Sequence, residues 1–111
     1  MFTFDDLLSG RPVPLQATAR AARAFIRSLG ADIGEQIGKD EVTYRRGRVF
    51  CTLAVERGEV LVRFTGGNPL PDPHRLLRGE GKGPRFFRLR APTDLSDAAR
   101  ALIRAAYNQA T

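Results

Sequence analysis

Between residues 42 and 64, apolar and polar side chains alternate along the chain, which is the two-residue repeat of strands with one buried face. Two short turns, Arg46-Gly47 and Arg57-Gly58, divide this segment into three strands joined as hairpins. In the register that these turns favour, one sheet face is wholly apolar, and a slip by one residue would bury arginine. That predicted inner face consists of Val42, Tyr44, Val49, Cys51, Leu53, Val55, Val60, Val62 and Phe64.

The same two turns predict which residues lie opposite each other on neighbouring strands. The first turn is expected to place Arg45 opposite Arg48, Tyr44 opposite Val49 and Val42 opposite Cys51. The second turn is expected to produce the pairs Glu56–Glu59, Val55–Val60 and Leu53–Val62.

Helical spacing of apolar residues occurs on both sides of the predicted strands. From Leu15 to Leu29 apolar residues recur every three or four positions, and Gly30 follows where a left-handed C-cap belongs. The final helix is expected after Pro92, with Thr93 or Asp94 as its N-cap. A short helix or turn is also expected near the start of the chain, with Thr3 as its cap and Gly10 as its stop.

Two segments are predicted to be connections because they are rich in polar residues or in Gly and Pro. These are residues 31–41 and the long loop 66–84, which is followed by a strand over 85–91. The resulting fold class is α+β: a four-stranded antiparallel sheet, made of a three-stranded meander plus the strand after the long loop, with two helices packed on one face. Residues 1–111 are predicted to form a single domain, with residues 1–14 as an N-terminal extension.

Charge is distributed unevenly along this basic chain. The formal net charge is +6, and every basic residue except Lys39 and Lys82 is arginine. Residues 43–90 hold eleven basic and four acidic side chains, so the excess belongs to the predicted sheet and its loop. Arginine binds phosphates and carboxylates bidentately, although an Ala-, Arg- and Gly-rich composition also accompanies a GC-rich genome. Three further arginines, Arg20, Arg23 and Arg27, are expected on the solvated face of the first long helix.

Catalytic and metal-binding chemistry find little support in the sequence. His74 is the only histidine and Cys51 the only cysteine, so neither an N/S metal site nor an intramolecular disulfide can be assembled, and no cofactor is predicted. A pair of Asp72 with His74 is better explained as a turn in a Pro-rich loop. The stretch GEGKGP lacks the Gly-Lys-Ser/Thr ending of a phosphate-binding loop. The carboxylates that could form an acidic ridge, Asp32, Glu35, Asp40 and Glu41, share no periodic face.

The candidate functional surface is the opposite face of the predicted sheet, where arginine and phenylalanine are expected instead of ordinary solvated residues. Aromatic rings on an open sheet stack on bases while arginines hold phosphates, and the same residue types are common in protein interfaces. The predicted ligand or interface residues are Arg45, Arg48, Phe50, Leu61, Arg63, Phe86, Arg88 and Arg90.

Four stretches carry a resemblance to a known family: IRSLGADI, VTYRRGRVFCTLAVERGEVLVRF, DPHRLL and FFRLRAPTDLSDAARALIRAAY. Over about residues 15–108 the chain resembles the bacterial domain-of-unknown-function 5655 family. The most telling positions are Phe50 and, around the final helix, Asp94-Leu95 and Ala106-Tyr107. The resemblance implies no biochemical activity. More distantly it implies a similarity to small frataxin-like α+β proteins, some of them iron chaperones.

Three functions remain open at this point. The first is a non-enzymatic protein-interaction or self-association module, with a homodimer through the arginine-rich face as one form. The second is binding of nucleic acid or another anionic ligand by that face, and the third is a small enzyme of unknown reaction. No apolar run approaches transmembrane length and the start of the chain lacks a signal peptide, so a cytoplasmic protein without a membrane partner is expected.

Overall fold

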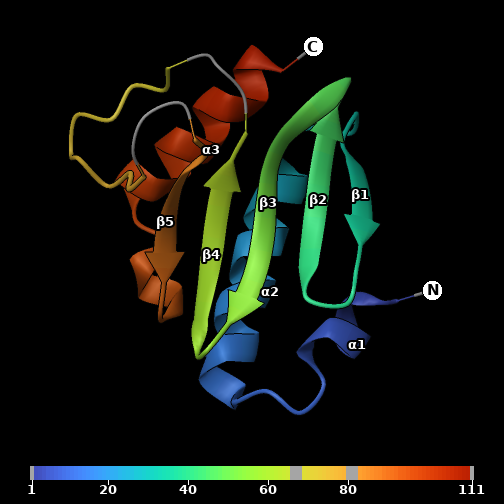
Figure 1. Ribbon diagram of the computed structural model, residues 1–111. Helices are drawn as coiled ribbons and strands as arrows, with labels where there is room; N and C mark the ends of the chain where they lie inside the picture. The colour runs from blue at the N-terminus through green and yellow to red at the C-terminus, as the bar shows by residue number, and fades with distance from the viewer. Residues whose placement is uncertain (1, 66–68, 80–82, 111) are drawn as a thin grey trace.

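A computed structural model describes residues 2–65, 69–79 and 83–110 of the chain. Five strands form one antiparallel sheet in the order β1-β2-β3-β4-β5, and helices α2 and α3 cover one of its faces (Figure 1). The α+β class with helices on one face is therefore confirmed, whereas the prediction of four strands is wrong. The elements are α1 (Phe4–Leu8), α2 (Val13–Ser28), β1 (Gly34–Ile37), β2 (Glu41–Arg46), β3 (Arg48–Glu56), β4 (Glu59–Phe64), β5 (Arg85–Leu89), a 3₁₀ turn (Pro92–Asp94) and α3 (Asp97–Gln109).

Strand β1 lies in a segment for which the sequence predicts only a connection. Its residues Gly34, Glu35 and Gln36 have low strand propensity and show no apolar alternation, so nothing local indicates a strand. It forms because it pairs with β2 along its whole length, from Gly34 opposite Arg45 to Ile37 opposite Val42. Tertiary pairing, and not local propensity, creates this edge strand.

The hairpin of β3 and β4 has the predicted register. Leu53 lies opposite Val62, Val55 opposite Val60 and Glu56 opposite Glu59. The turn residues Arg57 and Gly58 both have positive φ, at 40° and 82°, which is the backbone of a two-residue hairpin turn.

The hairpin of β2 and β3 differs from its prediction by a β-bulge. Tyr44 lies opposite Cys51 and Arg45 lies opposite Val49, so Phe50 is the extra residue. The expected pairs Arg45–Arg48, Tyr44–Val49 and Val42–Cys51 therefore do not form. A bulge re-aims the side chains near it. Phe50 therefore points to the helix side, where its side chain is only 2% exposed and its ring meets that of Tyr107 edge-to-face at 5.6 Å.

The helix termini are set partly by residues other than those predicted. The Thr3 side chain caps α1 as expected, whereas α3 is capped by Ser96, whose Oγ accepts a hydrogen bond from the Ala99 backbone N–H at 3.2 Å. The Asp94 carboxylate serves the preceding turn instead, by accepting from the backbone N–H of Arg90 at 2.8 Å.

Gly30 does not provide the expected left-handed C-cap of α2. The C-cap is Leu29, which keeps right-handed helical geometry, and Gly30 does not have positive φ. A Cβ at position 30 would collide with the Tyr107 hydroxyl and press on the Asp32 carboxylate. A side chain at position 30 would therefore displace the Tyr107 hydroxyl from its hydrogen bond with Asp32.

The core lies between the sheet and the two long helices, and it includes α1. Phe4, Leu7 and Leu8 of α1 are 5%, 2% and 1% exposed, so this first helix packs into the core. All the predicted inner-face residues are buried except Val49, which the bulge moves to the other face.

The described part of the long loop is anchored at its two ends. Arg78 exchanges two backbone hydrogen bonds with Phe86 of β5, and the Pro69 carbonyl accepts a hydrogen bond from Gln109 of α3. Leu70, Leu76 and Leu77 pack against the core. Residues 66–68 and 80–82 of the predicted loop, the latter being the central EGK of GEGKGP, lie outside the described residues.

Candidate functional site

The sheet face turned away from α2 and α3 is here named the outer face. In Figure 1 the sheet lies in front of both helices, and no helix covers the near side. Strand alternation places Arg45, Leu61, Arg63, Phe86 and Arg88 on this face, opposite the buried Val60, Val62, Phe87 and Leu89. Arg90 follows the end of β5 and is exposed.

Two of the eight predicted face residues, Arg48 and Phe50, are on the helix side, so their placement was wrong. The bulge at Phe50 turns both toward α3, and Arg48 Nη2 donates to the carbonyl of Gln109 at 3.1 Å. Sequence alternation cannot show this, because a bulge shifts the pattern by one residue without changing residue type. Of the two aromatic residues predicted for the outer face, Phe50 and Phe86, only Phe86 lies there.

The centre of the outer face is covered by an ion pair that crosses a strand. Arg63 of β4 donates to Glu41 of β2 with an Nη2–Oε2 distance of 3.0 Å, and β3 lies between these two strands. Thr52 and Ala54 of β3 are each only 4% exposed although no helix lies above them. Long neighbouring side chains therefore shield the small residues of the central strand.

A second ion-pair group lies over β4 and β5. Glu59 forms ion pairs with Arg88 and Arg90, with N–O distances of 3.1 and 3.4 Å. The Arg88 guanidinium also lies 4.9 Å from the ring centre of Phe86. Three of the four arginines on or beside the outer face are thus matched by glutamates of the same face.

Two charges of the outer face are left without an ion pair among the described residues. They are Arg45, near the end of β2, and Glu56, at the end of β3. Because β2 and β3 are antiparallel, these charges lie toward opposite ends of the sheet. The outer face is therefore close to neutral overall, with its uncompensated charges far apart.

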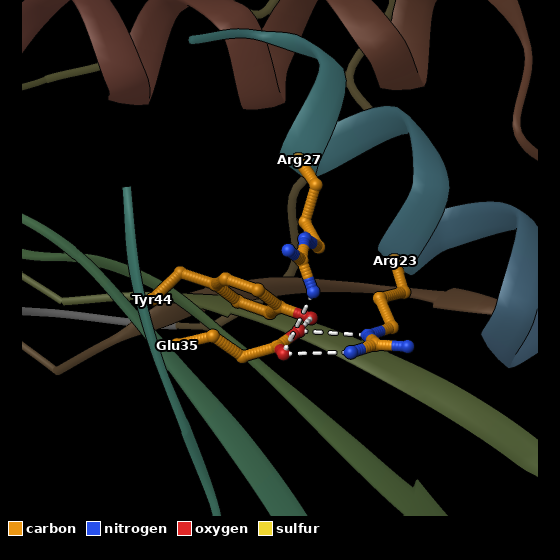
Figure 2. A network of polar contacts seen from close by, with 4 residues as sticks. All are labelled: Arg23, Arg27, Glu35 and Tyr44. Atoms are coloured by element: carbon orange, nitrogen blue, oxygen red, sulfur yellow. Dashed lines mark hydrogen bonds and ion pairs between the residues drawn. The ribbon is translucent and has the colours of Figure 1, made fainter. Parts of the chain in front are cut away.

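On the helix side, Glu35 of β1 is the centre of a polar network (Figure 2). Both of its carboxylate oxygens accept from Arg23 of α2 at 2.8 Å, Arg27 donates at 3.3 Å, and the Tyr44 hydroxyl donates at 2.9 Å. The hydrogen bonds from Arg23 hold the pKa of Glu35 below its ordinary value, and burial raises the pKa of Tyr44. Arg23 and Arg27 thus bind a carboxylate and do not form the simple solvated face that the sequence predicts.

A second helix-side network attaches α3 to the start of β1 and to the end of β2. The Tyr107 hydroxyl donates to Asp32 at 2.6 Å, and Arg46 Nε donates to the same carboxylate at 2.9 Å. Arg46 also lies 4.2 Å from the Tyr107 ring centre and donates to the Tyr107 carbonyl. The hydrogen bond from Tyr107 lowers the pKa of Asp32. Sequence reasoning missed both networks because each one joins side chains from three separate segments of the chain.

The residues considered for catalysis are used in other ways. The Asp72 carboxylate accepts from the backbone N–H groups of Leu76 and Leu77 at 2.8 and 3.0 Å, while His74 is exposed. Cys51 is buried, and burial raises the pKa of its thiol. Within residues 2–65, 69–79 and 83–110, no three His, Cys, Asp or Glu side chains lie close enough together to hold a metal ion.

The fold and its charged surfaces define a small two-layer α+β domain in which no helix of the described residues lies over one face of the sheet. The chain belongs to DUF5655, a family described as a domain of unknown function, whose match covers residues 4–110. No curated protein and no solved structure matches the chain. In the described part of the chain, no helix has the length and apolar character needed to cross a membrane.

Proposed function

We propose that this domain is a non-enzymatic interaction module that self-associates, with the outer faces of two copies packed against each other. The observation that supports the proposal best is the internal pairing of the outer-face arginines with Glu41 and Glu59. A phosphate-binding face leaves its guanidinium groups free for the ligand. Arginine and aromatic residues are enriched in protein contact surfaces, and Arg63, Arg88 and Phe86 supply these residue types on the outer face.

The two unpaired charges suggest how the copies are arranged. Arg45 and Glu56 lie toward opposite ends of the antiparallel strands. In a two-fold arrangement with the strands of the two copies antiparallel, each Arg45 meets the Glu56 of the other copy. This isologous contact satisfies both charges at once and brings the Leu61 and Phe86 side chains of the two faces together.

Charge reversal tests this arrangement directly. In sedimentation velocity experiments at low salt, we expect the wild-type chain to show a concentration-dependent dimer. Arg45→Glu and Glu56→Arg should each weaken it by about tenfold, because like charges then face each other. The double variant Arg45→Glu/Glu56→Arg should restore the dimer, since the charge order is exchanged but complementary.

A control variant distinguishes an effect at the outer face from a general effect of changing the protein's net charge. Ala17→Glu places one new carboxylate at an exposed position of α2, on the helix side, and should leave the dimer unchanged. A monomeric wild-type chain at high concentration, or a double variant as weak as either single variant, would contradict the proposal.

Binding of nucleic acid or another anion by the outer face is the alternative hypothesis. Exposed Arg45, which has no carboxylate partner among the described residues, and Phe86 are the groups that would serve it. The salt dependence of binding, described below, distinguishes the two hypotheses.

A further inference from the structure

Arginine side chains contact aromatic rings at six places in the described part of the chain. In four of them the guanidinium also has a carboxylate partner: Arg20 with Asp5, Arg23 with Glu35, Arg46 with Asp32 and Arg88 with Glu59. The recurring unit is therefore an aromatic ring, a guanidinium and an anion. The ring restricts the guanidinium and the anion neutralises it.

Two arginines of α3 depart from this pattern. The guanidinium carbons of Arg100 and Arg104 each lie 5.7 Å from the ring centre of the same residue, Phe25 of α2. Both arginines are exposed, and neither has an ion pair within the described residues. They are four residues apart on one helix, where like charges repel. The unit here has a ring and two guanidinium groups but lacks the anion.

The arginines of α2, in contrast to Arg100 and Arg104, already have carboxylate partners. Arg20 is engaged by Asp5, and Arg23 and Arg27 by Glu35. Phe25 is half-buried, so its position is fixed by the core, and the two arginines contact it from the neighbouring helix. The positive charge of Arg100 and Arg104 is thus held in place and left available.

We propose that Phe25, Arg100 and Arg104 form a binding site for a phosphate group. A phosphate has several oxygens that match the planar donor fork of each guanidinium and a charge that balances two arginines, whereas chloride is a single spherical acceptor with one charge. The bound phosphate relieves the repulsion between the two arginines. The site lies on the helix side of the sheet and is independent of self-association through the outer face.

The test uses the full chain and inorganic phosphate, added at constant ionic strength by exchange against sodium chloride. We expect saturable changes in the NMR signals of the side-chain Nε–H groups of Arg100 and Arg104. Adenosine monophosphate, as a second probe, distinguishes a free phosphate from a phosphate ester: equal or tighter binding indicates an ester, and weaker binding indicates the free ion.

Matched variants identify the groups responsible. Arg100→Gln and Arg104→Gln keep helix propensity, so the fold should persist, and each should weaken phosphate binding by about tenfold through loss of charge-assisted hydrogen bonds. Arg57→Gln removes one exposed charge in the turn between β3 and β4 and should leave binding unchanged. Signal changes that do not saturate, or equal losses in Arg57→Gln and Arg104→Gln, would overturn the proposal. Failure here would leave the dimer experiment unaffected.

Discussion

The two sides of the sheet use the same kinds of residue in different ways. On the helix side, Glu35 is held by two arginines and a tyrosine, and its side chain is 14% exposed. On the outer face, Glu41 is held by Arg63 alone, and its side chain is 49% exposed. Removing one partner of an ion pair that is shielded from water leaves an uncompensated charge and is costly, whereas an exposed pair contributes little to stability. Substitutions should therefore destabilise the fold more on the helix side than on the outer face.

The largest expected effect separates neighbouring residues of β3. Leu53→Asp puts an unpaired carboxylate under the helices and should cost at least about 4 kcal/mol, enough to unfold the domain. Thr52→Asp should cost less, about 2 kcal/mol, because residue 52, although only 4% exposed, lies opposite Arg63 on the outer face, where that guanidinium can pair with the new carboxylate. Urea melts measure both. The reverse ranking would mean that the assignment of the two faces is wrong.

The second prediction compares two phenylalanines that sequence patterning placed on one face. Phe50→Ala removes a buried ring that packs on Tyr107, and should cost about 3–4 kcal/mol. Phe86→Ala should cost about 1 kcal/mol, since its ring is partly exposed. Thermal melts of the two variants test the bulge, because without it Phe50 would be the tolerant position.

The third prediction compares the two carboxylates directly. Glu35→Gln removes the charge that binds Arg23, Arg27 and the Tyr44 hydroxyl, and should cost about 2 kcal/mol at neutral pH. Glu41→Gln should cost less than about 1 kcal/mol, because its ion pair with Arg63 is exposed. Equal costs in chemical denaturation would remove the distinction between the two sides.

Acidification sharpens this third comparison. The folded-state pKa of Glu35 lies below its ordinary value, so ionised Glu35 contributes stability that is fully present above the unfolded-state pKa, roughly 4.3. The contribution is lost as the pH falls through the lower, folded-state pKa. The stability difference between the wild-type chain and Glu35→Gln should therefore shrink below about pH 4. A difference that grows on acidification would contradict the assignment of a charged Glu35.

The smallest expected effect concerns nucleic acid. If the outer face binds single-stranded nucleic acid, Arg45→Ala should reduce the steepness of the plot of log K, the association constant, against log[salt] by about 0.7. Arg20→Ala on α2 should leave this slope unchanged. Under the self-association proposal, both variants change the weak attraction of a labelled oligonucleotide to the same small extent. Fluorescence anisotropy titrations at several salt concentrations measure the two slopes.

The local pattern of apolar and polar residues was enough to predict the strands and helices whose residues follow a single repeat throughout. The β3–β4 hairpin follows from alternation and a Gly-containing turn, and α2 follows from helical spacing. The bulge at Phe50, in contrast, depends on the packing of that ring against Tyr107, which lies far away in the sequence. Strand β1 likewise depends on pairing with β2 and on the network around Glu35.

The candidate site was predictable in part for the same reason. Alternation placed Arg45, Leu61, Arg63, Phe86 and Arg88 on the outer face, and the structure has them there. Their glutamate partners were not predictable, because Glu41 and Arg63 meet across an intervening strand. Side-chain pairing over that distance leaves no signal in a single sequence.

The bulge at Phe50 has a consequence for the order in which parts of the domain open. It directs Arg48 toward the last turn of α3, where Arg46 and Arg48 donate to the carbonyls of Tyr107 and Gln109. The final turn of a helix usually frays because its carbonyls lack partners. Here the tip of the β2–β3 hairpin supplies partners for these carbonyls. The end of α3 and this hairpin tip should therefore exchange their amide hydrogens as one cooperative unit, with similar protection that both segments lose in the same opening event.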